Sequence, residues 1–245
     1  MSGRKRQERR QKPGAEHFTL EGERQKNTMT DRGYKLEKLV PQTQNQGFYI
    51  RTIRRSDVTL CHGPPGTGKT HIAIGVAVQM IRSKEIEKII ICRPVVPVGR
   101  DIGYLPGGME DKLGPYLRPL FDELSVYCEE SLLKIWMDTK KLEIVPLSMM
   151  RGRTFKNAFV IMDEAQNATY AELKMFLTRF GLGAKVVVTG DLNQSDLPRH
   201  LAGDYECVID DLEGLSKLEI VELTKADIVR HELTGQIEDR LSRRS

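Results

Sequence analysis

Residues 63–70 read Gly-Pro-Pro-Gly-Thr-Gly-Lys-Thr, and this stretch decides the fold. It fits the phosphate-binding loop pattern GxxxxGK[ST] at every position. Apolar runs at 58–61 and 72–78 flank it, which predicts a strand, a glycine-rich loop and a helix in that order. The glycines let successive backbone N–H groups point into one concavity, and the positive end of the helix faces the same place. The stretch therefore predicts a site for nucleotide phosphates.

Most positions of this loop receive an expected role in holding a nucleotide. Lys69 is expected to reach the β- and γ-phosphates, and the Thr70 hydroxyl is expected to bind Mg²⁺. ATP and Mg²⁺ are thus the predicted cofactors. The other residues expected to line the nucleotide site are Gly63, Pro64, Pro65, Gly66, Thr67, Gly68 and His71.

A second signal is the apolar run at 158–162, which ends in Asp163-Glu164. An apolar strand that ends in an acidic pair, well after a phosphate loop, is typical of a Walker B element. Asp163 is expected to hold Mg²⁺ through a water molecule, and Glu164 to orient and help deprotonate the attacking water. The structural alternative is an acidic pair that caps a helix after the strand.

Three more polar residues lie at expected strand ends or just before the loop. Gln194 follows the apolar strand at 185–189 and is the candidate sensor of the γ-phosphate. Arg93 follows the strand at 88–92, where it is placed to touch the nucleotide, a nucleic-acid strand or a neighbouring subunit; its alternative role is a structural ion pair. Gln46 is the candidate for adenine recognition, because an amide both donates and accepts hydrogen bonds; the alternative is a polar helix start.

The apolar runs are nearly continuous, which is typical of strands covered on both faces in a parallel sheet. Strands and helices alternate along the chain, which predicts an α/β fold with a doubly wound, mainly parallel sheet. One domain over residues 34–245 accounts for the pattern. Further expected elements are a helix at 117–137 in two pieces, a helix at 170–180, strands at 142–145 and 218–223, and a last helix from 227 to about 241.

Composition and charge narrow the class of protein. The hydrophobic fraction of 39% permits a core, and no run approaches the roughly 20 apolar residues that span a membrane. The four cysteines form no CxxC pair, and there is no apolar signal core at the N-terminus. Cys61 and Cys92 lie in expected strands and are expected to be buried thiols. These features predict a cytoplasmic protein with no membrane partner.

The net charge of +4 is unevenly distributed. Residues 1–33 lack apolar periodicity and predict a disordered basic arm. Such an arm can neutralise the phosphates of a nucleic acid, or it can be a solvated tail without a specific partner. The basic residues concerned are Arg4, Lys5, Arg6, Arg9, Arg10 and Lys12, with a second group at Arg240, Arg243 and Arg244.

The ordered set of motifs resembles the PhoH-like family of P-loop ATPases over about residues 40–235. Besides the phosphate loop and the acidic pair, the resemblance rests on Arg93-Pro94, Leu105-Pro106-Gly107, Arg151-Gly152-Arg153-Thr154-Phe155, Asp163-Glu164-Ala165-Gln166-Asn167, Phe176-Leu177-Thr178-Arg179, the run from Thr189 to Pro198 and Asp227-Ile228-Val229-Arg230-His231. It implies a RecA-like P-loop NTPase core, similar to the first motor domain of superfamily 1 helicases. It also implies ATP hydrolysis with Mg²⁺ and action on RNA or another single strand.

The resemblance further implies an assembly. A helicase of that kind places arginines on a second motor domain, so a single-domain motor needs another copy. We therefore expect a homo-oligomeric ring, with six subunits as the favoured number, in which Arg230, or second to it Arg179, faces the neighbour's nucleotide. Longer relatives carry a nuclease-like or RNA-binding domain that this chain is not expected to encode, and Ser195 stands where an apolar residue is commoner. The alternative function is a nucleotide-switched assembly module that acts on a protein partner without nucleic acid.

Overall fold

The computed structural model of the protein describes residues 33–35, 38–94, 109–198, 200–229 and 240. The predicted basic arm over 1–33 lies almost wholly outside these residues, and so do Arg230 and His231 of the closing motif. In chain order the elements are α1 (Gln44–Arg55), β1 (Val58–His62), α2 (Lys69–Arg82), β2 (Lys88–Arg93), α3 (Met109–Tyr127), α4 (Glu130–Asp138), β3 (Leu142–Pro146), η3 (Leu147–Met150), β4 (Ala158–Met162), η4 (Ala165–Asn167), α5 (Tyr170–Leu177), β5 (Lys185–Gly190), α6 (Asp204–Leu212), β6 (Leu218–Glu222) and η5 (Lys225–Asp227).

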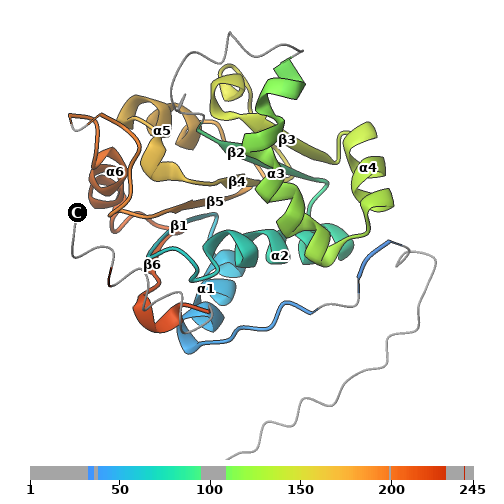
Figure 1. Ribbon diagram of the computed structural model, residues 1–245, viewed down its shortest axis with the longest axis horizontal. Coiled ribbons are helices and arrows are strands. Elements are labelled where there is room, and N and C mark those ends of the chain that lie inside the picture. Colours follow the sequence, from blue (N-terminus) through green and yellow to red (C-terminus); the bar gives the residue numbers. More distant parts are fainter. Residues whose placement is uncertain (1–32, 36–37, 95–108, 199, 230–239, 241–245) are drawn as a thin grey trace, which may run out of the picture. The chain divides into compact units, whose positions relative to one another are not determined.

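The sheet confirms the predicted α/β class. Its strands lie in the order β3-β2-β4-β5-β1-β6, and every neighbouring pair is parallel (Figure 1). The strand β5 separates β1, which leads into the phosphate loop, from β4, which ends at the acidic pair. Because all strands point the same way, the loops after β1, β5, β4 and β2 meet at one edge of the sheet.

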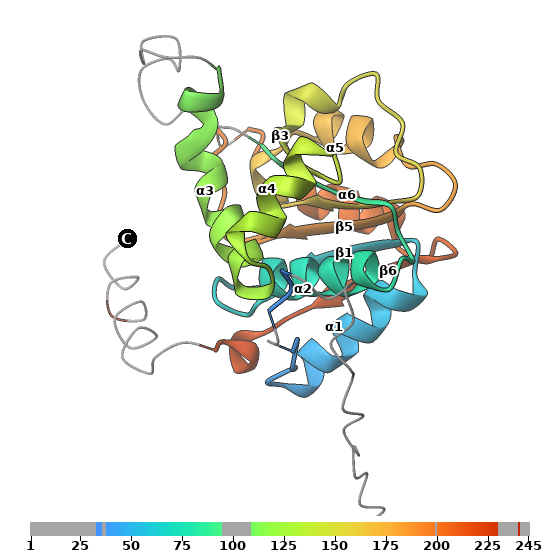
Figure 2. The ribbon, with the colours of Figure 1, turned by 90° about the vertical axis from the view of Figure 1, so that its right-hand side faces the viewer.

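Side chains alternate between the two faces of the sheet, and each face has its own apolar core. In β4, Phe159 and Ile161 pack with α1, α2, α3 and α4 on one face. Val160 and Met162 pack with α5 and α6 on the other face. The helices thus cover the sheet on both sides, as Figures 1 and 2 show. Burial on both faces explains why these strands read as continuous apolar runs.

The helix α6 was not predicted, and the helix α1 was only the alternative reading of the segment before the phosphate loop. The helix α6 follows a turn that ends with Gly203 in the left-handed conformation (φ 95°). The helix α1 begins after Thr43, whose side-chain oxygen accepts a hydrogen bond from the Gln46 backbone N–H, a standard N-cap. Of the two readings of the segment before the phosphate loop, the polar helix start is therefore present.

The segment after β6 closes over the start of α1. In η5, Asp227 is 1% exposed, and its carboxylate accepts hydrogen bonds from the Thr43 hydroxyl at 2.5 Å and the Asn45 amide at 3.0 Å. The same carboxylate accepts from the Thr224 backbone N–H at 2.8 Å, which completes a capping box. The last helix was predicted to begin at Asp227, but Asp227 ends η5 and Ile228 is extended, with φ −69° and ψ 116°. Residues 230–239 of the predicted helix lie outside the described residues.

Three of the cysteines, including Cys61 and Cys92 as predicted, are buried thiols, and Cys207 is exposed. Within the described ranges, no helix combines the length and apolar character that crossing a membrane requires.

Candidate functional site

The edge of the sheet where the strands end holds a cavity of about 630 Å³. Its walls come from the phosphate loop, the start of α2, the ends of β4 and β5, α3 and the segment after β6. The residues that line it are Val40, Gln42, Gln46, Pro65, Gly66, Gly68, Lys69, Thr70, His71, Ile72, Glu123, Asp163, Glu164, Gly190, Asp191, Gln194 and Val229. Most of the predicted site residues thus meet in one place, although they come from distant parts of the chain.

The phosphate loop depends on glycine at its first position. Gly63 has φ 151°, and a Cβ atom there would lie 2.1 Å from the carbonyl oxygen of Leu223. Its N–H donates to the Gly190 carbonyl at 3.2 Å, which ties the loop to the end of β5. The Thr67 hydroxyl donates to the Pro64 carbonyl at 2.8 Å. Gly63, Pro64 and Thr67 therefore shape the loop and do not line the cavity themselves.

The loop places Lys69 in the wall of the cavity. Its ammonium group donates to the carbonyls of Gly63 at 2.6 Å and Pro64 at 2.8 Å. Burial lowers the pKa of this ammonium from its ordinary 10.5, and the charges of Asp191, Glu164 and other nearby groups act against that shift. A cation at the start of a helix forms an electrostatic site that suits phosphate oxygens.

The residues predicted to hold Mg²⁺ are in direct contact. The Thr70 hydroxyl donates to Asp163 Oδ1 at 2.6 Å, and the Thr189 hydroxyl donates to the same oxygen at 2.8 Å. Asp163 is 6% exposed, so its carboxylate is fixed by these neighbours. A hydroxyl and a carboxylate are hard oxygen donors of the kind that Mg²⁺ uses beside substrate phosphates, so this pair fits the ion. No larger cluster of metal-binding side chains occurs among the residues that the structure describes.

Glu164 lies beside Asp163 in a conformation that L residues rarely adopt, with φ 57° and ψ 45°. Left-handed backbone at a residue other than glycine costs about 1 kcal/mol or more and is often found at functional sites. The side chain lines the cavity, and both of its oxygens accept hydrogen bonds. Arg93 donates to Oε1 at 2.8 Å, and Gln166 donates to Oε2 at 2.6 Å. Arg93 therefore forms an ion pair here, which was one of its two predicted roles.

Gln166 connects the ends of β4 and β5, and although it belongs to a motif of the family resemblance, no role was predicted for it. Its side-chain oxygen accepts from the Asp191 backbone N–H at 3.0 Å, while its side-chain nitrogen holds Glu164. Its carbonyl accepts from the Ser195 hydroxyl at 2.9 Å, so the polar residue at 195 has a structural partner. Gln194, the predicted γ-phosphate sensor, lines the cavity next to Asp191. Asp191, which also lines the cavity, was not predicted. Its position directly after a strand was the signal that could have identified it as a site residue.

Gln46 reaches the cavity but is already engaged. Its Nε2 donates to the carbonyls of Thr67 at 3.1 Å and Asp227 at 3.4 Å, and its Oε1 accepts from the Gln42 N–H at 2.7 Å. The amide thus joins α1, the phosphate loop and η5, and its role with adenine stays a prediction. Gln42 lines the cavity with an exposed side chain.

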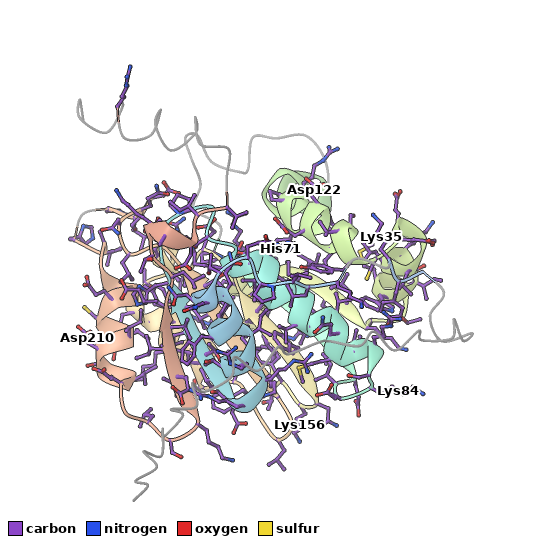
Figure 3. The ribbon with its side chains drawn as sticks, turned by 90° about the horizontal axis from the view of Figure 1, so that it is seen from below. Lys35, His71, Lys84, Asp122, Lys156 and Asp210 are labelled. Atoms are coloured by element: carbon purple, nitrogen blue, oxygen red, sulfur yellow. The ribbon has the colours of Figure 1, made fainter. Side chains whose placement is uncertain are left out.

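His71 connects the start of α2 to α3. Its Nδ1 lies 2.8 Å from Glu123 Oε2, and its Nε2 lies 2.7 Å from the Tyr127 hydroxyl. The label in Figure 3 marks His71 at the end of α2 that points to the cavity. Tyr127 comes so close to α2 that a Cβ atom on Gly75 would lie 2.7 Å from its hydroxyl oxygen. Glu123 was not predicted, because it lies 52 residues from His71 in the chain and no motif distinguishes it from other acidic residues of a helix.

Two arginines were predicted to act on the nucleotide of a neighbouring subunit, and the structure describes one of them. Arg230 lies outside the described residues. Arg179 follows α5, and its carbonyl accepts from the Phe155 N–H at 2.9 Å. Its Nε is buried without a hydrogen-bond partner among the described residues. It does not line the cavity of its own chain, so only a role toward another copy stays open for it.

Comparison with known proteins shows the family of the chain. The family model described as PhoH-like protein matches residues 38–242. The chain is 45% identical over 198 residues to a PhoH-like protein of Synechocystis, covering 80% of this chain and 60% of that protein. It is 43% identical over 203 residues to a PhoH-like protein of Mycobacterium tuberculosis, covering 83% and 58%. The chain therefore spans less than two thirds of the length of these relatives.

Among solved structures, the large terminase of a thermophilic bacteriophage is similar to the chain, with a TM-score of 0.52 and 12% identity. The match covers 82% of this chain and 50% of the terminase chain. At this identity the likeness shows the fold alone.

Proposed function

The chain belongs to the PhoH-like protein family, and we propose that it is a Mg²⁺-dependent ATPase that couples hydrolysis to RNA or another single-stranded nucleic acid. One observation carries the ATPase part of the proposal. Lys69, the Thr70–Asp163 pair, Glu164 and Gln194 all line one cavity at the end of the parallel strands. A nucleotide in that cavity would meet a cation, a metal site, a base and a polar sensor together.

The reaction is ATP and water giving ADP and phosphate. The loop N–H groups and Lys69 hold the phosphates and offset the charge that develops on them. Thr70 and Asp163 would hold Mg²⁺, and this ion would neutralise part of the negative charge on the phosphates. Glu164 orients the attacking water and accepts its proton, while Gln194 contacts the γ-phosphate.

Support for nucleic acid comes from the helicase-like motif set and from the basic residues between Arg4 and Lys12. Lysine and arginine side chains release counterions from a phosphate backbone, so such binding weakens as salt rises. The active form that we propose is a homo-oligomeric ring, with six subunits as the favoured number. In a ring, Arg230 of one subunit faces the nucleotide of the next, and such an arginine can add roughly 10³ to 10⁵ in rate.

The test is phosphate release by the purified protein with MgATP, with and without single-stranded RNA, beside Lys69→Ala. We expect turnover in the wild type, a higher rate with RNA, a loss of that rise at high salt, and no turnover in the variant. Turnover that depends on Lys69 but ignores both RNA and DNA contradicts the nucleic-acid part. That result favours the nucleotide-switched assembly module with a protein partner.

The ring has its own test, which is light scattering with and without ATP at the concentrations used for turnover. We expect a mass of several subunits in the presence of ATP. A monomer that hydrolyses ATP at the full rate contradicts the proposed trans-acting arginine.

A further inference from the structure

The carboxylate proposed as the base is restrained on both of its oxygens. Arg93 holds Oε1 at 2.8 Å and Gln166 holds Oε2 at 2.6 Å. A general base must offer an oxygen to the water that it activates. In this arrangement each oxygen of Glu164 already accepts one hydrogen bond, which leaves one lone pair on each oxygen and limits the directions from which the carboxylate can receive a water molecule.

The ion pair follows from the register of the sheet. In β2 and β4, Cys92 lies opposite Met162, and the Asp163 N–H donates to the Cys92 carbonyl at 2.9 Å. The residues that follow these positions therefore emerge at the same edge of the sheet. Arg93 reaches Glu164 because its strand is the direct neighbour of the strand that carries the acidic pair.

Arg93 approaches Glu164 from outside the nucleotide cavity. Glu164 lines that cavity and Arg93 does not. The two side chains are 23% and 35% exposed for Arg93 and Glu164, respectively, so water reaches the pair. Ion pairs that water reaches are weak and exchange readily. A guanidinium group also binds phosphate oxygens through two parallel hydrogen bonds, an arrangement stronger than one hydrogen bond to a carboxylate oxygen.

We propose that Arg93 is a positioning residue that restrains Glu164, and that a phosphodiester group of a bound single strand takes the guanidinium away from it. This rests on the proposed function, because it explains how nucleic acid raises the rate of hydrolysis. When Arg93 leaves, both lone pairs of Oε1 can receive the attacking water and its proton. Gln166 keeps Oε2 in place, and its contact with Asp191 keeps the carboxylate aligned with the end of β5.

The competition can be measured without any hydrolysis. Binding of fluorescent single-stranded RNA is titrated in the absence of nucleotide with the wild type, Arg93→Ala, Glu164→Gln and the double variant. We expect Arg93→Ala to weaken binding about tenfold, because a bidentate phosphate contact is lost. Glu164→Gln should tighten binding about threefold, since the guanidinium loses its competing anion. The double variant should bind like Arg93→Ala alone.

A matched control is Arg55→Ala. Arg55 is exposed, lies at the far end of α1 and is paired with Glu219. It should change RNA binding little. The proposal is overturned if Glu164→Gln does not tighten binding, if Arg93→Ala binds like Arg55→Ala, or if the wild type binds no single strand.

Turnover supplies a second, separate readout. Without RNA, Arg93→Ala should raise kcat about three- to tenfold with little change in KM, as expected when a base is released. RNA should then add almost nothing further. Arg93→Lys should lie between the two, because lysine keeps the charge but not the fork. A lower kcat in Arg93→Ala overturns the restraint. An inactive wild type refutes the proposed ATPase, while the RNA titrations still decide the competition.

Discussion

Replacement of Asp227 by alanine is expected to destabilise the protein and weaken its nucleotide site. The buried carboxylate accepts hydrogen bonds from the Thr43 hydroxyl, the Asn45 amide and both the backbone and hydroxyl donors of Thr224. Hydrogen bonds to a charged group contribute about 1.5–3 kcal/mol each. Thr43 is half-buried, and Asn45 and Thr224 are exposed, so in the variant water can bind these donors and offset part of the lost hydrogen-bond energy. We expect a net loss of about 2–4 kcal/mol in the free energy of unfolding.

Urea unfolding followed by circular dichroism measures this loss. With a slope of about 3 kcal/mol per molar urea, a loss of about 3 kcal/mol lowers the midpoint by roughly 1 M. The matched control is Asp210→Ala, which removes an exposed carboxylate on α6 (Figure 3). Equal midpoints for the wild type and Asp227→Ala, or an equal fall in the control, would refute the reasoning.

The pH dependence of the difference tests the cause. Burial alone would raise the pKa of Asp227, but hydrogen bonds from Asn45, Thr43 and Thr224 outweigh it and lower the pKa below its ordinary 3.8. A carboxyl whose pKa is lower in the folded state stabilises the protein fully at pH values above the pKa of the unfolded state. That stabilisation is lost as the pH falls through the pKa of the folded state. The gap between wild type and Asp227→Ala should thus be constant from about pH 5 to 8 and shrink below roughly pH 4.

Two further predictions concern packing and thiol chemistry. Gly75→Ala should lower the free energy of unfolding by about 1 kcal/mol, because the clash with Tyr127 exceeds the gain in helix propensity. Its control is Gly47→Ala in α1, where the added methyl group meets only ordinary contacts, so that this variant should be neutral or stabilising. Equal urea midpoints for the two variants would contradict the prediction. Of the cysteines, Cys207 should react fast with a thiol reagent at pH 8 in the native protein, since it is exposed. The others should react slowly, because burial raises the pKa of Cys61 and Cys128 to about 12 and that of Cys92 well above 9.0. Fast reaction of a second thiol would count against the buried core.

The parts of the fold that the sequence predicts well are those with a local cause. The strands expected at 158–162 and 88–92 agree with the structure to within one residue, because continuous apolar runs leave strong patterns. The helix expected at 117–137 is indeed in two pieces, although α3 begins at Met109. The helix α1 was hidden by its polar start, its glycine and its β-branched residues, and only the cap at Thr43 marked it.

The parts of the site that could not be predicted depend on strand order and on contacts between distant segments. Arg93 meets Glu164 because β2 and β4 are neighbours, although the two residues are 71 positions apart. Gln46 was assigned to the nucleotide, yet its amide also binds three separate backbone segments, which no local pattern reveals. Lys69 and the acidic pair, in contrast, line one cavity, since the ends of parallel strands must meet at one edge, and their roles there stay predictions.

The most direct measurement of the central claim compares binding and hydrolysis of MgATP in the wild type and Glu164→Gln, with Glu213→Gln at an exposed position as the control. Glu164→Gln should bind MgATP as tightly as the wild type, while its turnover falls by about 10² to 10⁴, because only the proton acceptor has been removed. The control should be unchanged in both. Turnover at the wild-type rate in Glu164→Gln, with binding intact, would contradict the assignment of this cavity as the site of hydrolysis.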